Sequence, residues 1–201
     1  MKNFLFVLTL LFSLSSFSQS PVDKSFPPEE LFALGSYYYP EQWDFSQWER
    51  DLKKMSEMGI KFTHFAEFAW AMMEPEEGKF DFTLVDALIK QADKYKKKLI
   101  LLWFGLWKNA ESAYVPAWMK QDSETFFRAE MYGGERLNTI FPLCWEAVER
   151  DAAAFSRLIG HLREVDKNSS VIMVQVENEV GLLGTERDYC RQAEEAFTGN
   201  V

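Results

Sequence analysis

The sequence has 201 residues, of which 47% are hydrophobic and 26% charged, so it can bury a globular core. Its formal net charge of −9 argues against nucleic acid and against an anionic membrane surface as partners. Aromatic residues make up 16% of the chain, and such side chains can fill a core or stack on sugar rings.

Residues 1–18 have the pattern of a signal peptide. Lys2 supplies the positive start, Phe4–Leu14 is apolar, and Ser16–Ser18 is a small-x-small cleavage signal. A membrane span needs about 20 apolar residues, so this shorter run predicts no membrane anchor. We therefore expect export to the periplasm or the extracellular space, with residues 19–30 as a short lead-in segment.

The first elements predicted along the mature chain are a strand, a helix and a second strand. The first strand covers Leu31–Tyr38, and Ser46–Glu49 fits a capping box that opens a helix running to Met58. Gly59 stands where a glycine commonly follows a helix end. The second strand covers Ile60–Ala66.

The remaining chain continues the same alternation of strands and helices. Apolar stripes at helical spacing and runs of β-branched residues mark these elements. We expect a helix at Thr83–Lys97, a strand at Leu99–Phe104 and then an irregular segment at Gly105–Pro142. A helix at Cys144–Val165 follows, with a core-facing stripe of Val148, Ala152, Phe155, Ile159 and Leu162. The last elements are a strand at Val171–Val176 and a helix from Thr185 to about Phe197.

This order predicts an α/β fold with a parallel sheet. An open doubly wound sheet and a (β/α)₈ barrel both fit the alternation. The segment Tyr37–Glu41 holds no glycine where a nucleotide-binding fold needs a Gly-rich turn, which favours the barrel. A whole TIM barrel needs eight βα units and about 250 residues, whereas this chain supplies about the first four units.

Polar and aromatic residues follow each predicted strand. The carboxyl ends of barrel strands converge on one face, so we expect these residues to share a pocket of carboxylates, amides and indoles. Such a pocket suits a neutral, polyhydroxylated ligand better than a phosphate. Its candidate members are Tyr39, Glu41, Trp43, Glu67, Trp70, Trp103, Trp107, Lys108, Asn109, Glu177, Asn178 and Glu179.

The segment Val171–Glu179 carries the strongest functional signal, because an apolar strand runs directly into Glu-Asn-Glu. Carboxylates at the mouth of a buried strand lose water, which adjusts their pKa for proton transfer. By strand alternation Gln175, Glu177 and Glu179 share one face and could all point inward. We expect Glu179 to be a catalytic acid and Glu177 to orient it or to anchor the pocket.

Other reactive residues have simpler interpretations. His64 and His161 are isolated, so we expect packed histidines and no metal site. Cys144 and Cys190 could form a bridge in an exported protein, but two buried free thiols are the favoured interpretation. The acidic loop 74–77 is expected to be solvated.

Several of these motifs resemble the clan of barrel glycosidases that contains glycoside hydrolase families 42 and 35. The family 42 resemblance rests on Gly35–Trp43, Glu67–Trp70 and Glu74–Gly78. The segment Gln175-Val-Glu-Asn-Glu-Val-Gly181 resembles the acid/base motif of family 35. Two further segments, Leu101–Asn109 and Val115–Trp118, resemble a bacterial subgroup of family 35 β-galactosidases.

The resemblance implies a retaining, two-carboxylate mechanism that needs no cofactor. Glu179 then corresponds to the general acid/base, and Asn178 to the amide that contacts the sugar 2-hydroxyl. Val180 departs from the tyrosine that many family 35 members carry there. The nucleophile of the family is a glutamate on the seventh strand, to which nothing in this chain can be matched.

The sequence therefore predicts an exported, β-galactosidase-like glycoside hydrolase, with residues 31–201 forming the N-terminal half of its catalytic domain. Its expected partners are a β-galactoside oligosaccharide or polysaccharide, and a missing C-terminal half or a second copy. Beside Glu179, we expect the substrate-binding residues to be Glu67, Tyr39, Trp107, Asn109, Glu177 and Asn178. The alternatives are a non-catalytic carbohydrate-binding protein and an inactive gene fragment on the same scaffold.

Overall fold

The computed structural model describes residues 32–65 and 69–199. The chain divides into two units, Met1–Leu31 and Phe32–Val201, and the fold below belongs to the second. The predicted signal peptide, the lead-in segment and Glu67 lie outside the described residues. In the described part of the chain, no helix combines the length and the apolar character needed to cross a membrane.

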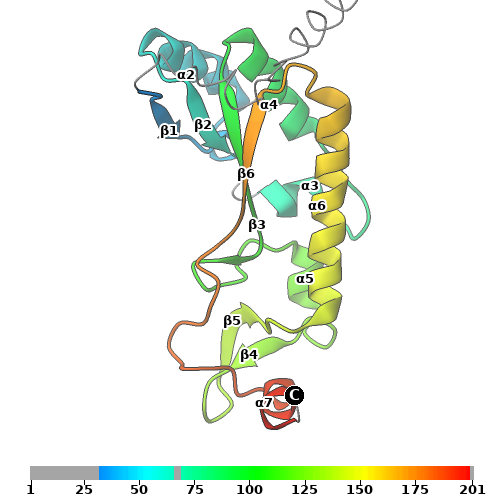
Figure 1. Ribbon diagram of the computed structural model, residues 1–201. Coiled ribbons are helices and arrows are strands. Elements are labelled where there is room, and N and C mark those ends of the chain that lie inside the picture. The colour runs from blue at the N-terminus through cyan, green and yellow to red at the C-terminus, as the bar shows by residue number, and fades with distance from the viewer. Residues whose placement is uncertain (1–31, 66–68, 200–201) are drawn as a thin grey trace, which may run out of the picture. The chain divides into compact units, whose positions relative to one another are not determined.

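Four parallel strands form the main sheet (Figure 1). They are β1 (Gly35–Tyr37), β2 (Phe62–Phe65), β3 (Lys98–Lys108) and β6 (Val171–Asn178), and they lie in that order across the sheet. In a doubly wound sheet the strand order reverses at a switch point, whereas a barrel adds each strand beside the previous one. The observed order is that of a barrel, as predicted.

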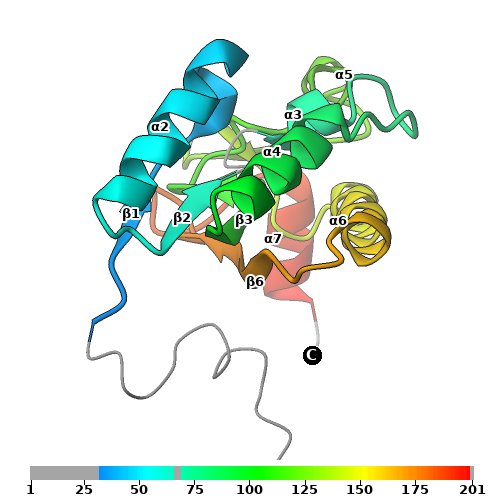
Figure 2. The ribbon, with the colours of Figure 1, turned by 90° about the horizontal axis from the view of Figure 1, so that it is seen from above.

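Helices connect the strands. The longer ones are α2 (Phe45–Glu57), α4 (Thr83–Lys94) and α6 (Trp145–Val165), and Figure 2 shows these three on one side of the sheet. The shorter elements are η1 (Pro40–Gln42), α3 (Ala69–Met73), α5 (Ala117–Gln121) and α7 (Arg191–Thr198).

Alternate residues of β3 enter two different apolar clusters. Leu99, Leu101 and Trp103 belong to the larger cluster, which includes buried residues of α2, α4 and α6. Ile100, Leu102 and Phe104 form a smaller cluster with the partly buried Tyr39, Phe62 and Ile172. The sheet therefore has a helix-covered face and an opposite face, and the latter is the one that a barrel turns inward.

Local signals explain how α2 begins and ends. Asp44, and not Ser46 as predicted, is the N-cap, and its carboxylate accepts a hydrogen bond from the Ser46 amide at 2.9 Å. At the other end Gly59 has the left-handed φ of 77°. The amide of Ile60 donates to the carbonyl of Met55 at 2.9 Å, which completes a Schellman motif.

Two predictions for the long segment after β3 are wrong. β3 extends to Lys108, and the segment predicted to be irregular contains α5 and an antiparallel hairpin of β4 (Arg128–Glu130) and β5 (Arg136–Ile140). The turn between β4 and β5 includes Gly133 and Gly134, whose φ values of 102° and 87° favour glycine. The last helix also begins later than expected, after the N-cap Cys190.

The acidic loop after α3 also differs from its prediction. Glu74 is buried, and its carboxylate accepts hydrogen bonds from the Trp70 indole and from the Gly78 amide, both at 2.8 Å. Glu76 is exposed and pairs with Lys79, as a solvated loop residue would. Glu74 therefore holds the loop together from within.

Candidate active site

The candidate site lies where β3 and β6 reach their carboxyl ends. Trp103 pairs with Val176 and Lys108 pairs with Asn178, so residues 104–107 of β3 stand opposite Glu177 alone. Glu177 and Glu179 have left-handed φ values of 58° and 51°. Non-glycine residues adopt this conformation only when their surroundings hold them there, and such residues are frequent at functional sites.

This irregularity turns Glu177 toward the backbone of β3 and toward α6. Its carboxyl accepts a hydrogen bond from the Trp107 amide at 2.9 Å and a longer one from the Leu106 amide at 3.4 Å. Gln175 instead donates to the side chain of Asn178 at 3.3 Å. The prediction that Gln175 and Glu177 share one inward face is therefore wrong, because the left-handed residue breaks the alternation of the strand.

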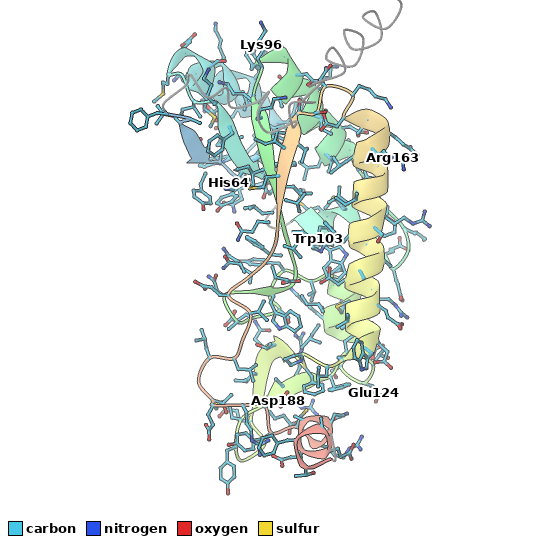
Figure 3. All side chains as sticks on the ribbon, viewed as in Figure 1. His64, Lys96, Trp103, Glu124, Arg163 and Asp188 are labelled. Carbon is cyan, nitrogen blue, oxygen red and sulfur yellow. The ribbon has the colours of Figure 1, made fainter. Side chains whose placement is uncertain are left out.

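Asp151 of α6 reaches the same place from the helix-covered face. Its carboxylate accepts a hydrogen bond from the Trp103 indole at 2.6 Å and from the Leu106 amide at 3.2 Å. Figure 3 shows Trp103 between β3 and α6. The Leu106 amide thus lies within reach of both carboxyl groups.

The electrostatics of the two carboxyls follow from their burial. Loss of water, the charge of Asp151 and a hydrogen bond between the two carboxyls together raise the pKa of Glu177 to about 8, against the lowering effect of the Trp107 and Leu106 amides. Burial also raises the pKa of Asp151, while hydrogen bonds from Trp103 and Glu177 act in the opposite direction. Burial and the like charge of Asp151 therefore favour the protonated form of Glu177.

Asn178 and Asn109 lie together on the other side of the irregularity. The Asn178 amide group donates to the Asn109 side-chain oxygen at 2.9 Å, and the Asn109 backbone amide donates to the Asn178 carbonyl at 3.2 Å. Asn109 also has a left-handed φ of 54°. The structure thus brings together these two predicted substrate-binding residues, one from each strand.

Glu179 follows Asn178 directly in the sequence, just after the end of β6. Its carbonyl accepts a hydrogen bond from the Ala110 amide at 3.1 Å, so its backbone is tied to the end of β3. Its side chain is exposed. Glu177 and Glu179 therefore differ in kind: the first is a partly buried carboxyl held by the backbone of β3, and the second is free to meet a ligand from solvent.

Tyr39 and Trp107 occupy opposite sides of the sheet. Tyr39 packs on the smaller cluster, beside Phe104 on the face that a barrel turns inward. Trp107 packs on the larger cluster, and its buried indole nitrogen has no acceptor within the described residues. Of these two predicted substrate contacts, only Tyr39 has the side chain on the inward face.

Asp151 was missed by sequence reasoning, although the chain contains a signal for it. The buried residues of α6 are Ala147, Ala154, Leu158 and Leu162, a stripe shifted from the predicted one. Asp151 falls on this true stripe at helical spacing, and a carboxylate inside an apolar stripe needs a partner.

The histidines and cysteines are packed, as predicted. His161 lies 2.6 Å from Asp86 and stacks on a phenylalanine, and His64 stacks on Tyr37. Cys144 and Cys190 are free and buried. Within residues 32–65 and 69–199, no group of three or more His, Cys, Asp or Glu side chains could hold a metal ion.

The fold is that of part of a β/α barrel with carboxylates and amides at its strand ends, and comparison with known proteins assigns the family. The family model described as β-galactosidase, glycoside hydrolase family 42, matches residues 37–200. This chain belongs to glycoside hydrolase family 42. The assignment confirms the family 42 part of the resemblance seen in the sequence.

Curated relatives and solved structures agree with this assignment. The chain is 31% identical to "Beta-galactosidase BgaH" of Haloferax lucentense over 172 residues, and 30% identical to "Beta-galactosidase BgaA" of a Thermus species over 175 residues. These matches cover 82% and 83% of this chain but 24% and 25% of the relatives. The chain thus spans about a quarter of their length.

The structural match is with the polyextremophilic β-galactosidase of the Antarctic haloarchaeon Halorubrum lacusprofundi, at a TM-score of 0.64 and 27% identity. It covers 79% of this chain and 23% of that one. A β-galactosidase from the psychrophilic Marinomonas ef1 shares the fold at a TM-score of 0.62. The fold is therefore that of a fragment of a TIM barrel, as predicted.

Proposed function

We propose that this chain carries the acid/base part of an exported, retaining β-galactosidase, with Glu179 as the general acid/base. The observation that carries the proposal is the pair Asn178–Glu179, held to Asn109 and Ala110 at the carboxyl ends of two neighbouring parallel strands. Active sites of TIM-barrel enzymes lie at this end of the strands. Membership of a family whose model is described as β-galactosidase supports a terminal β-galactoside as the substrate class.

In this mechanism Glu179 first gives its proton to the glycosidic oxygen as the aglycone leaves. It then removes a proton from the water that hydrolyses the glycosyl-enzyme intermediate. Asn178 is its neighbour, with its amide nitrogen donating to Asn109, which supports the role of contacting the sugar 2-hydroxyl that the family resemblance implies. The exposed side chain of Glu179 suits a group that must meet both a sugar and water.

A second carboxylate is required as the nucleophile. In retaining enzymes the two carboxyls face each other about 5–5.5 Å apart across the scissile bond. Glu177 does not fit this role, because its carboxyl is bound by the Trp107 amide and lies against Asp151. We propose that a strand other than the four described ones supplies the nucleophile, and that the 201-residue chain alone does not turn over β-galactosides.

The test is a chimera in which residues 32–199 replace the matching part of BgaH from Haloferax lucentense. Glu179→Gln in this chimera should lower kcat for lactose by about 10²–10⁴-fold, the usual contribution of general acid–base catalysis. The same substitution should slow the first step of dinitrophenyl galactoside hydrolysis less, because dinitrophenolate leaves without needing a proton. Glu76→Gln, a substitution of an exposed loop glutamate, is the matched control and should leave both rates unchanged.

Equal activity of Glu179→Gln and the parent chimera on lactose would contradict the assignment. Tight galactoside binding without turnover in the parent chimera would favour the carbohydrate-binding alternative. Rapid hydrolysis of nitrophenyl galactoside by the purified 201-residue chain would contradict the proposed external nucleophile. N-terminal sequencing of the secreted protein tests export, with a mature start near Gln19 expected.

A further inference from the structure

A pair of partly buried carboxyl groups lies near the candidate acid/base. Glu177 comes from β6 and Asp151 from α6, and both reach the Leu106 amide of β3, at 3.4 and 3.2 Å. The pair therefore joins the two strands that carry the site to the helix that covers them. Glu179 is only two residues from Glu177.

The site around the pair is shaped to hold these two groups. A Cβ atom on Gly105 would lie 2.2 Å from one carboxylate oxygen of Asp151 and 2.4 Å from the other, so only glycine leaves room for this carboxylate. Trp103 and Trp107 each contribute one N–H donor, from the indole and from the backbone respectively. Four donated hydrogen bonds thus converge on two carboxyls.

The charges around the pair do not balance two negative groups. β3 contributes only neutral donors, the Trp103 indole and two backbone amides. The ionisable groups facing each other are Glu177 from β6 and Asp151 from α6, and no cation contributes to the pKa shift of either within the described residues. Arg150, next to Asp151 on α6, instead pairs with Glu77 at 2.7 Å on the surface. Two like charges here would repel, so one shared proton satisfies the pair.

We propose that Asp151 and Glu177 are a positioning pair that shares one proton, and that this proton holds the strand end in the shape that presents Asn178 and Glu179 to the sugar. When the proton leaves, two partly buried negative charges repel each other and the ends of β3 and β6 shift. The positioning role rests on the proposed function, whereas the shared proton does not.

The first arm of the test measures unfolding of the full chain by urea between about pH 4 and pH 9. A carboxyl whose pKa is raised on folding is protonated in the folded state while the unfolded one is ionised, so unfolding releases a proton in that window. Its contribution to stability is present below the unfolded pKa of about 4.5 and is lost as the pH rises to about 8. The urea midpoint should therefore fall across this window and then level off.

Glu177→Gln removes the titrating group and keeps a neutral side chain of the same shape. Its urea midpoint should lose the fall between about pH 5 and pH 8. Glu164→Gln, the same substitution at an exposed position of α6, should titrate like the parent chain. A fall in Glu177→Gln as large as in the parent overturns the shared proton. If Glu177→Gln fails to fold, infrared spectra of the parent decide, since a protonated-carboxyl band must be present near pH 7 and absent near pH 9.

The second arm measures binding of isopropyl β-thiogalactoside, which is not hydrolysed, to the chimera. Its Kd should rise about tenfold between pH 7 and pH 9 in the parent and stay constant in Glu177→Gln. An identical alkaline rise in both proteins overturns the positioning role. No binding at any pH, with the unfolding titration as expected, contradicts the proposed function and leaves the shared proton in place.

Discussion

The two faces of the main sheet are built differently. On the helix-covered face β3 packs against buried residues of three long helices, whereas on the opposite face the buried cluster consists of Ile100, Leu102 and Phe104. On this opposite face Tyr37 stays largely exposed. This difference indicates that packing on the helix-covered face stabilises the described unit. The opposite face remains accessible to a ligand or to further chain.

The largest effect should come from paired substitutions on β3. Leu101 and Leu102 are neighbours that are 0% and 1% exposed, one on each face. Leu101→Ala should lower the free energy of unfolding by about 4 kcal/mol and Leu102→Ala by about 2 kcal/mol, because the open face can collapse around a cavity. Urea unfolding followed by circular dichroism measures both. An equal or larger loss for Leu102→Ala would break the comparison.

A second pair of substitutions sharpens the role of the covered face at the site. Gly105→Ala places a Cβ against the Asp151 carboxylate and should cost about 2 kcal/mol, the usual scale of overpacking. The control Gly160→Ala lies in α6 with open space around its Cβ, so it should gain up to about 1 kcal/mol of helix propensity. Thermal unfolding measures the stability change of each variant. A Gly105→Ala variant as stable as the parent would show that the Asp151 carboxylate can move aside freely.

The smallest effect is expected on the open face. Tyr37 stacks on His64 with the ring centroids 4.2 Å apart, although Tyr37 is 68% exposed. Tyr37→Ala should cost about 1 kcal/mol, the value of an aromatic pair, while Tyr37→Phe keeps the stacked ring and should cost little. A loss in Tyr37→Ala comparable to that in Leu101→Ala would mean that the open face contributes as much as the covered one.

The sequence predicted the elements whose signals are local. Thr83 begins α4 as expected, and Val171 begins β6, because apolar spacing and β-branched runs act through near neighbours. The hairpin of β4 and β5 was missed because its strands are short and polar, and only the glycine pair at 133–134 marks its turn. Its two strands pair with each other and not with the main sheet, so the alternation of strands and helices gave no indication of them.

The site was predicted in part. The end of β6 brings Asn178 to Asn109 as convergence of strand ends requires, and this could be read from the chain. The orientation of Glu177 could not, because one left-handed residue reverses the alternation on which the prediction depended. Asp151 was missed because the apolar stripe of α6 was placed one residue too far along the chain, on Val148 in place of Ala147.

The sequential order β1-β2-β3-β6 has a consequence for synthesis. In these four strands, each later strand pairs with the strand synthesised just before it. The partner of each added strand has therefore already been synthesised. Domains fold from the N-terminal side during translation, so β1, β2 and β3 are synthesised before β6 emerges. The nascent chain can therefore add its strands one at a time, and the Glu-Asn-Glu segment joins a scaffold that is already assembled.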